Sequence, residues 1–338
     1  MLEVGRTRGG ARSLSEVTVR IDMDSAYRKP RKEGMSVAAS LRSEEVESHE
    51  AHTRPGLGPV EEELIETVAP VPAKPFLSWA GSKRRLLPQI LPHIPEEFGR
   101  YIEPFLGGGS LFLELAPLDA LLNDACEPLI DTWRAVQRNA TGVHREAVRR
   151  PLSKDDYYVA RAERGGGYLQ RAGRFVYLNK GAFNGLYRVN LRGEFNVPWG
   201  APKSDFICDR ANLVAVQELL NPERVQITSG DFEAAVDLAG PNDFVFVDPP
   251  YVTSHNNNGF VEYNEKIFSW DDQVRLAQAA HRAVERGATV MVTNANHEKI
   301  ITLYEGFEQV VLERASTLAA SSAKRGRTTE ILLIGRAG

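Results

Sequence analysis

The stretch Phe244-Val-Phe-Val-Asp-Pro-Pro-Tyr251 decides the fold class of this chain. Its first four residues are all apolar, which predicts a strand buried on both faces, as in a parallel sheet. An acid, two prolines and an aromatic residue then follow at the carboxyl end of that strand, where α/β proteins place their active sites. The stretch therefore predicts an α/β fold with a functional site that begins at Asp248.

The chemistry of this tetrad, Asp248 to Tyr251, favours binding of a planar amino group. Two consecutive prolines fix the backbone and remove two N–H donors, so carbonyl oxygens remain. The Asp248 carboxylate and one such carbonyl can accept both hydrogens of an exocyclic NH₂ group, and the Tyr251 ring can stack on the base that carries it. This frees the nitrogen lone pair to attack a sulfonium methyl group. The alternative is an ordinary Asp-Pro turn, which the complete tetrad disfavours.

Strand patterns and helical patterns alternate on both sides of the tetrad. Strands are expected at residues 101–103, 120–122, 225–228, 244–247, 288–293, 307–312 and 330–334. Residues 270–286 have the apolar periodicity of a helix, with Ser269 as the expected N-cap and Asp272 three residues later. Such alternation predicts a mostly parallel sheet that is covered by helices on both faces.

A glycine-rich turn, Glu103-Pro-Phe-Leu-Gly-Gly-Gly109, follows the first of these strands. Glycines here let the backbone approach a bound cofactor, because no Cβ stands in the way. Asp124 ends the next strand, where doubly wound folds place the acid that accepts hydrogen bonds from ribose hydroxyls. The two features indicate a nucleoside-containing cofactor. Asp124 can also serve as the N-cap of a helix expected at residues 127–138, and the two roles are compatible.

The composition excludes several classes of protein. The chain has 338 residues and a formal net charge of −4, and no apolar run approaches the roughly 20 residues that span a bilayer. Cys126 and Cys208 lie in no CxxC motif, so neither a disulfide framework nor a metal site is expected, and a cytoplasmic location is the default. Residues 1–73 combine one aromatic residue with charge clusters and a Pro-rich end, which predicts a disordered extension.

Residues 145–192 interrupt the alternation of strands and helices. They include 11 lysines and arginines but only four acidic residues. Because the whole chain is acidic, any binding of DNA has to depend on such a local basic face. An arginine-rich, solvated helix surface explains the same charge equally well.

From about residue 74 to 335, the sequence resembles the Dam-type (D12 class) DNA N6-adenine methyltransferases. The motifs occur in that family's order: Pro75-Phe-Leu-Ser-Trp-Ala-Gly-Ser-Lys83, Glu103-Pro-Phe-Leu-Gly-Gly-Gly109, Asn123-Asp124, Asn184-Gly-Leu-Tyr-Arg188 with Gly193-Glu-Phe-Asn-Val-Pro198, and Asp248-Pro-Pro-Tyr251. The resemblance implies a Rossmann-like S-adenosylmethionine methyltransferase sheet with an antiparallel last strand, and a mainly helical DNA-recognition insertion. It also implies methylation of adenine N6 in DNA after base flipping, with S-adenosylmethionine as the cofactor.

The resemblance further implies roles for individual residues. The expected contacts of S-adenosylmethionine are Trp79, Lys83, Asp124 and Asp248, with Glu103 and Phe105 lining its pocket and Asp231-Phe232 bordering its adenine. The expected catalytic residues, which hold the flipped adenine, are Asp248, Pro249 and Tyr251. Ser78 and Ser82 replace the lysine and glycine usual in relatives, which weakens the expectation of DNA contacts from this segment.

The expected DNA-reading residues lie in the basic stretch and are Phe183, Asn184, Leu186 and Arg188. By its chemistry, Arg188 can read a guanine through two hydrogen bonds. Leu186 or Phe183 can fill the space that the flipped base leaves, although core packing is an equally good reading for both. The basic run at residues 321–327 is expected to contact phosphates.

These inferences divide the chain into an extension at residues 1–73, a catalytic domain at 74–144 and 225–338, and a target-recognition insertion at 145–224. Double-stranded DNA is the expected partner, a cognate restriction endonuclease is a candidate partner, and the oligomeric state is left open. The rival functions are methylation of cytosine N4 or of a glutamine side chain, and DNA binding without catalysis. The insertion and the acid of the tetrad favour adenine, and the complete cofactor motifs favour an enzyme.

Overall fold

The computed structural model describes residues 72–251, 268–314 and 328–337. All of them belong to one compact unit, Glu66–Gly338. The predicted extension, apart from residues 72 and 73, and the basic run at 321–327 lie outside the described residues. No helix in the described ranges has both the length and the apolar character needed to cross a bilayer.

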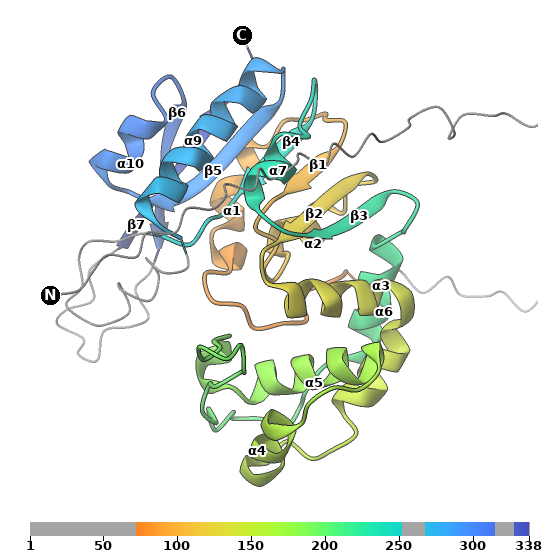
Figure 1. Ribbon diagram of the computed structural model, residues 1–338. Coiled ribbons are helices and arrows are strands. Elements are labelled where there is room, and N and C mark those ends of the chain that lie inside the picture. Colours follow the sequence, from red (N-terminus) through yellow and green to blue (C-terminus); the bar gives the residue numbers. More distant parts are fainter. Residues whose placement is uncertain (1–71, 252–267, 315–327, 338) are drawn as a thin grey trace, which may run out of the picture. The chain divides into compact units, whose positions relative to one another are not determined.

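A seven-stranded sheet organises the unit (Figure 1). Its strands are β1 (Tyr101–Glu103), β2 (Ala120–Asp124), β3 (Val225–Ser229), β4 (Phe244–Val247), β5 (Thr289–Ala295), β6 (Glu308–Arg314) and β7 (Thr328–Gly335). They lie in the order β3-β2-β1-β4-β5-β7-β6. The pairs among β1 to β5 are parallel, and β7 is antiparallel to both β5 and β6. The predicted fold class is therefore confirmed, and the strand bounds differ from the predicted ones by two residues at most.

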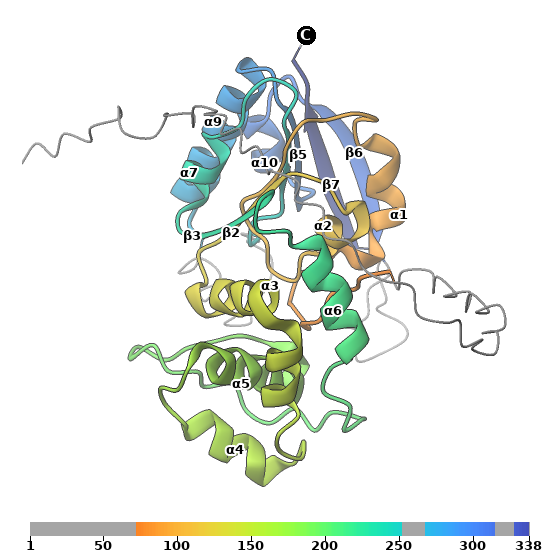
Figure 2. The same ribbon diagram turned by 90° about the vertical axis from the view of Figure 1, so that its right-hand side faces the viewer.

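Helices cover both faces of this sheet (Figure 2). One face carries α1 (Leu87–Ile90), α2 (Ser110–Leu115), α3 (Glu127–Ala147) and α6 (Arg210–Leu219), and the other carries α7 (Phe232–Val236), α9 (Trp270–Glu285) and α10 (Glu298–Leu303). Successive residues of β4 alternate between the two cores: Phe244 packs in the cluster that includes Trp133 of α3, and Val245 in the cluster that includes Leu276 of α9. Burial on both faces explains why β4 is apolar throughout.

The predicted helix after the tetrad is α9, which ends one residue earlier than expected. It begins with the predicted reciprocal cap. The Ser269 hydroxyl accepts from the Asp272 amide at 3.1 Å, and the Asp272 carboxylate accepts from the Ser269 amide at 2.9 Å. The cap fixes where the helix starts relative to the tetrad.

Two further helices, α4 (Lys154–Ala162) and α5 (Tyr168–Gly181), lie beyond α3 at one end of the unit in both views (Figures 1 and 2). Helix α3 bends at Asn139, whose side chain accepts from the Gly142 amide at 2.8 Å, and it contacts both the sheet and α5. It therefore runs across the predicted boundary between residues 144 and 145. Leu213 and Val216 of α6 belong to the core cluster next to the sheet. The division into catalytic domain and insertion stays a prediction.

Candidate active site

The carboxyl ends of the parallel strands meet at one edge of the sheet. The chain runs outward from β1 through β2 to β3 and then returns to β4 on the other side of β1. This reversal is a topological switch point, where doubly wound folds bind their ligands. Glu103 ends β1 and Asp248 directly follows β4. The predicted glycine turn and the predicted tetrad therefore begin on adjacent strands.

The Asp248 carboxylate is fixed through one of its two oxygens. Oδ1 lies 2.6 Å from the Lys83 ammonium and accepts a hydrogen bond from the Thr293 hydroxyl at 2.8 Å. Within the part of the chain that the structure describes, Oδ2 has no partner. The side chain of Asp248 is 17% exposed and that of Lys83 is 5% exposed. A buried pair of charges thus holds the carboxylate in one orientation with an acceptor oxygen left over.

Tyr251 is anchored by a carboxylate on a distant strand. Its hydroxyl donates to Glu330 Oε2 at 2.6 Å, and the Lys83 ammonium lies 4.8 Å from the centre of its ring. Glu330 itself is 4% exposed and lies 3.7 Å from the same ammonium. It reaches this edge because β7 is antiparallel, so that Glu330 pairs with Ala295 at the carboxyl end of β5. The tetrad is therefore completed by residues from three other elements.

The backbone of the tetrad is held from behind. The Gln273 side chain of α9 donates to the Pro250 carbonyl at 3.3 Å and accepts from Asn294 of β5 at 3.0 Å. Gln273 and Asn294 are both fully buried. Pro249, between the two fixed points, is buried as well. Because buried amides must be hydrogen-bonded, this chain of contacts fixes the path of the backbone after Asp248.

The electrostatics of this edge favour a bound cation. Burial raises the pKa of Asp248, the ion pair with Lys83 acts in the opposite direction, and the charge of Glu330 adds to the rise. Burial also raises the pKa of Glu103 well above its usual value, and the charge of Asp248 contributes in the same direction. Ionised carboxylates are therefore costly here, and a positively charged ligand would reduce that cost.

The glycine turn, which is the candidate cofactor cradle, packs closely against Trp79 and Asp124. Gly107 has a φ of +47°, and a Cβ built on it would lie 2.7 Å from the Trp79 ring. The amides of Gly107 and Cys126 each donate to one oxygen of Asp124 at 2.9 Å. A carboxylate has about four acceptor positions, so Asp124 can still accept from hydroxyls. The N-cap of α3 is Cys126, whose side chain makes no cap hydrogen bond, so Asp124 does not occupy the N-cap position considered above.

Trp79 packs against this cradle, and Lys83 lies close to it through its neighbour Ser82. The Trp79 ring stacks with Tyr187 at 5.9 Å and with Phe175 at 6.3 Å between ring centres. Lys83 opens a short 3-10 helix, η1 (Lys83–Arg85), whose N-cap Ser82 contacts Ser110 at 2.9 Å between hydroxyl oxygens. The first motif thus joins the glycine turn on one side and the predicted insertion on the other.

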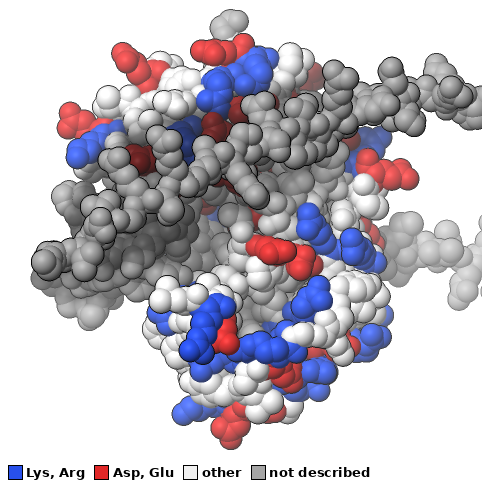
Figure 3. Space-filling model, viewed as in Figure 1, with Lys and Arg blue, Asp and Glu red and all other residues white. Residues whose placement is uncertain are grey.

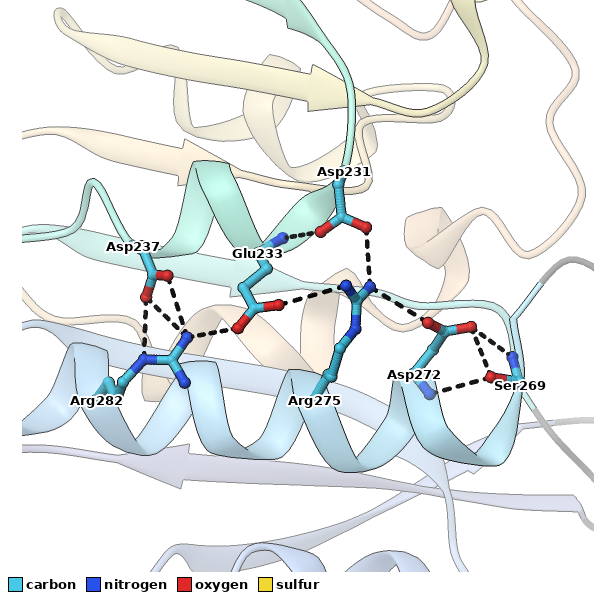
Figure 4. Close-up of polar contacts among 7 residues, drawn as sticks. All are labelled: Asp231, Glu233, Asp237, Ser269, Asp272, Arg275 and Arg282. Atoms are coloured by element: carbon cyan, nitrogen blue, oxygen red, sulfur yellow. Dashed lines mark hydrogen bonds and ion pairs between the residues drawn. The ribbon is translucent and has the colours of Figure 1, made fainter. Parts of the chain in front are cut away.

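An aromatic cluster and an ion-pair network lie next to this cradle. Phe105 stacks on Phe232 at 5.4 Å between ring centres. Arg275 of α9 binds Asp231 at 2.8 Å and lies over the Phe232 ring at 4.7 Å, and Arg282 continues the network to Glu233 and Asp237 of the α7 segment (Figure 4). The network ties α7 to α9, so it fixes Asp231-Phe232 relative to the tetrad.

The predicted DNA-reading residues lie around the short 3-10 helix η3 (Phe183–Gly185), within the predicted insertion. Asn184 and Gly185 have φ values of +53° and +63°, so the tight turn predicted from the Asn-Gly pair is present. Phe183 is 49% exposed and Leu186 half-buried, so Phe183 does not pack in the core. Arg188 is exposed, and its Nε donates to the Asn196 side chain at 2.7 Å.

A buried side chain clips this turn to the first motif. Asn179 of α5 accepts from the Ser78 amide at 2.8 Å and donates to the Ser78 carbonyl at 2.8 Å. It also donates to the Gly185 carbonyl at 3.2 Å. Ser78 therefore contributes its backbone to this clip. Sequence reasoning missed Asn179 because an asparagine within a helix gives no signal of such a contact.

Acidic side chains partly neutralise the basic stretch. Lys and Arg side chains gather over α4 and α5 with acidic ones among them (Figure 3). Glu163 lies 2.7 Å from Arg150, 3.3 Å from Arg149 and 3.9 Å from Arg174. The count of basic residues therefore exceeds the charge that is available to a ligand.

Comparison with known proteins agrees with this geometry. Residues 79–318 match the family model of the D12 class N6 adenine-specific DNA methyltransferases. The chain is 38% identical over 268 residues to the type II methyltransferase M1.LlaDCHI of Lactococcus lactis subsp. cremoris, an alignment that covers 77% of this chain and 94% of the relative. It is 35% identical over 279 residues to the type II methyltransferase M.MjaIII of Methanocaldococcus jannaschii, covering 75% and 96%. It is 30% identical over 273 residues to the DNA adenine methylase of Escherichia coli strain K12, covering 78% and 95%. The chain belongs to the D12 class of N6-adenine-specific DNA methyltransferases.

Proposed function

We propose that this enzyme holds the N6 amino group of the target adenine between Asp248 Oδ2 and the backbone carbonyl of Pro249. As a member of its class, the enzyme transfers a methyl group from S-adenosylmethionine to N6 of adenine in DNA. The observation that supports the proposed site is the asymmetry of Asp248, whose Oδ1 is engaged by Lys83 and Thr293 while Oδ2 is left as an acceptor among the described residues. A carboxylate held in this way cannot rotate away from the amino group.

The reaction then follows from what these side chains accept and fix. Hydrogen bonds from N6 to Asp248 and to the Pro249 carbonyl draw the nitrogen towards tetrahedral geometry and free its lone pair. The bound cofactor supplies the methyl group on a positively charged sulfur. One proton has to leave N6 when the new N–C bond forms, and Asp248 Oδ2 is the acceptor already bonded to it. Lys83 lies over one face of the Tyr251 ring, so the base stacks on the opposite face.

The cradle next to this site fits S-adenosylmethionine. The remaining acceptor positions of Asp124 suit ribose hydroxyls, and the absence of a side chain at Gly107 lets the Trp79 ring pack directly against the turn. We assign Trp79, Glu103 and Phe105 to the lining of the pocket, with Asp231-Phe232 beside the adenine of the cofactor. The raised pKa of Asp248, which has burial as its main cause, agrees with a site that accepts a cation.

We assign target recognition to residues 145–224. The turn at Asn184 presents Phe183 and Arg188 to solvent, where Arg188 can read a guanine and Phe183 or Leu186 can occupy the space of the flipped adenine. Two of the relatives are named type II methyltransferases, which supports a role in restriction and modification beside a cognate endonuclease. We assign the enzyme to the cytoplasm, together with the DNA that it methylates.

The substitution Asp248→Ala tests the site. We expect methylation to fall by at least about 10²–10³-fold, the usual effect of losing one preorganised electrostatic contact. Asp271→Ala, an exposed acid in the first turn of α9, is the matched control and should behave as wild type. Mass spectrometry of nucleosides from treated DNA measures both the rate and the base. A folded Asp248→Ala variant with near wild-type activity contradicts the site, and N4-methylcytosine as product contradicts the choice of base.

A further inference from the structure

Glu330 is a buried carboxylate to which the proposed function assigns no role. It lies near the start of β7, is 4% exposed, and pairs in register with Ala295. An ionised side chain in such a place is costly unless charged or hydrogen-bonding partners compensate for it. Its partners include the Tyr251 hydroxyl at 2.6 Å and the Lys83 ammonium at 3.7 Å. Both partners belong to the proposed active site.

We propose that Glu330 is a positioning residue for methyl transfer, which anchors the Tyr251 ring and shares the Lys83 ammonium with Asp248. It is not a catalytic residue, because it acts through Tyr251 and Lys83. This inference rests on the roles proposed for Asp248 and Tyr251. The experiment distinguishes a failure of this inference from a failure of the proposed function.

The first part of this role is mechanical. A hydroxyl that donates to a carboxylate at 2.6 Å makes a short, charge-assisted hydrogen bond, which fixes the Tyr251 ring at its far end. The tetrad backbone fixes the near end, since Gln273 holds the Pro250 carbonyl. With Lys83 over one face, the ring presents its other face in a defined orientation. Loss of the anchor should therefore slow methyl transfer more than it weakens binding of the cofactor.

The second part of this role is electrostatic. The Lys83 ammonium has three N–H groups and lies 2.6 Å from Asp248, 2.9 Å from the Gly81 carbonyl and 3.7 Å from Glu330. Glu330 therefore competes with Asp248 for one positive charge. Its own charge also contributes to the raised pKa of Asp248, after burial as the main cause. Removing the charge of Glu330 should lower the pKa of Asp248 and widen the pH range in which Asp248 is ionised.

Other titratable groups face this cluster from neighbouring elements. They are Tyr101 and Glu103 of β1, where the Tyr101 hydroxyl donates to Glu103 Oε2 at 2.9 Å, and the Tyr251 hydroxyl. Burial raises the pKa of Tyr101, Glu103 and Tyr251 well above their usual values. The two tyrosines keep their protons throughout the acid range, whereas Glu103, whose pKa is raised, also gains a proton as the pH falls. The acid limb of the pH profile therefore reports on the Asp248 and Glu103 carboxyls together, and only the shift between a Glu330 variant and the wild type is assigned to Glu330.

The experiment uses the full chain with Glu330→Gln and Glu330→Ala. Glutamine keeps an acceptor for the Tyr251 hydroxyl but has no charge, whereas alanine lacks both. The measurements are the single-turnover rate of DNA methylation across pH, the affinity for labelled S-adenosylmethionine, and thermal unfolding. Glu308→Gln is the matched control, because Glu308 is an exposed carboxylate of the adjacent strand β6 paired with Arg336 at 2.6 Å.

We expect both Glu330 variants to move the acid limb to lower pH, since both remove the charge. Glu330→Ala should in addition lower the rate at the optimum by about tenfold or more, whereas Glu330→Gln should lower it much less. In a Tyr251→Phe background, the extra loss in Glu330→Ala should disappear while the pH shift remains. Affinity for the cofactor should stay within about twofold in every case, and Glu308→Gln should match the wild type.

An unchanged pH profile in Glu330→Gln overturns the inference, as does an equal loss from Glu330→Ala with and without the Tyr251 hydroxyl. If Glu330→Ala does not fold, the pH profile of Glu330→Gln decides alone. If Asp248→Ala is inactive while both Glu330 variants behave as wild type, the inference fails and the proposed function stands. An active Asp248→Ala variant instead removes the proposed function on which the inference rests.

Discussion

The tetrad at the sheet edge and the turn at Asn184 differ in which of their atoms the surrounding structure holds in place. At the tetrad, Asp248 is held by buried partners, and its surroundings carry several charges out of contact with water. At the turn, Phe183 and Arg188 are exposed, Asn179 holds the backbone from inside, and Asn196 holds the Arg188 guanidinium at the surface. One region fixes its side chains, and the other fixes its main chain and leaves its side chains accessible.

The difference follows from what each region has to do. Stabilising a developing charge requires groups that are already oriented in a site of low dielectric constant, so that no reorganisation is needed during the reaction. Reading a base edge requires long side chains that reach into a groove from a fixed starting point. Substitutions at the tetrad should therefore change the rate for every DNA site, whereas substitutions at the turn should change the preference among sites.

The largest effect in this comparison is expected from Lys83→Met. The Lys83 ammonium opposes the rise in the pKa of Asp248 that burial causes, so its loss should raise that pKa further. The acid limb of the rate profile should move to higher pH, and turnover at neutral pH should fall by about 10²–10³-fold. Lys299→Met, on the exposed surface of α10, is the control. An acid limb that stays in place in Lys83→Met shows that the ion pair does not control Asp248.

A smaller and selective effect is expected from Arg188→Ala. A bidentate contact to guanine contributes about 1–3 kcal/mol of discrimination, whereas a phosphate contact weakens all sequences alike. The variant should methylate sites altered at one guanine position relatively better, with unchanged affinity for the cofactor. Relative rates on a panel of singly altered duplexes measure this, and Arg192→Ala, exposed in the loop that follows, is the control. Uniform loss on every duplex, with a shallower salt dependence, identifies Arg188 as a phosphate contact.

The smallest effect on turnover is expected from Asn179→Ala, which leaves the tetrad intact. The substitution leaves the Ser78 amide and the Gly185 carbonyl without their partner, at about 1–3 kcal/mol for each group that stays buried. Thermal unfolding should occur several degrees lower, and preference among DNA sites should weaken by a few-fold. Asn212→Ala removes a similar pair of hydrogen bonds, which are solvent-exposed and join the half-buried Asn212 to the Lys74 backbone, and should change stability far less. Equal destabilisation by both substitutions contradicts a special role of Asn179.

Local sequence signals predicted most of the fold. All seven strands, the cap at Ser269 and the tight turn at Asn184 were expected from apolar runs, from capping chemistry and from an Asn-Gly pair. Each of these signals acts over a few residues, so a single sequence contains it in full. The same holds for the glycine turn, whose main-chain angles depend on the absence of a side chain.

The site residues that the sequence did not reveal are those that reach the tetrad through the pairing or packing of elements far away along the chain. Glu330 reaches Tyr251 only because β7 is antiparallel and pairs with β5 in one register. Thr293 and Gln273 contact the tetrad because β5 and α9 pack beside it. A lone acid at the start of the apolar run 330–334 was a visible signal for Glu330, since a buried carboxylate needs a partner. For Gln273, no signal in the sequence distinguishes it from an exposed residue of the same helix.

The position of β7 also affects the order in which the strands join the sheet during synthesis. This strand follows all the others along the chain, yet it lies between β5 and β6 and carries the partner of the Tyr251 hydroxyl. During synthesis, β6 therefore leaves the ribosome before the strand that joins it to the sheet. Contacts between residues so far apart form late and slowly in folding. We expect a nascent chain that ends before residue 328 to lack methylation activity. Methylation of DNA by a newly made molecule therefore begins only after β7 has been translated.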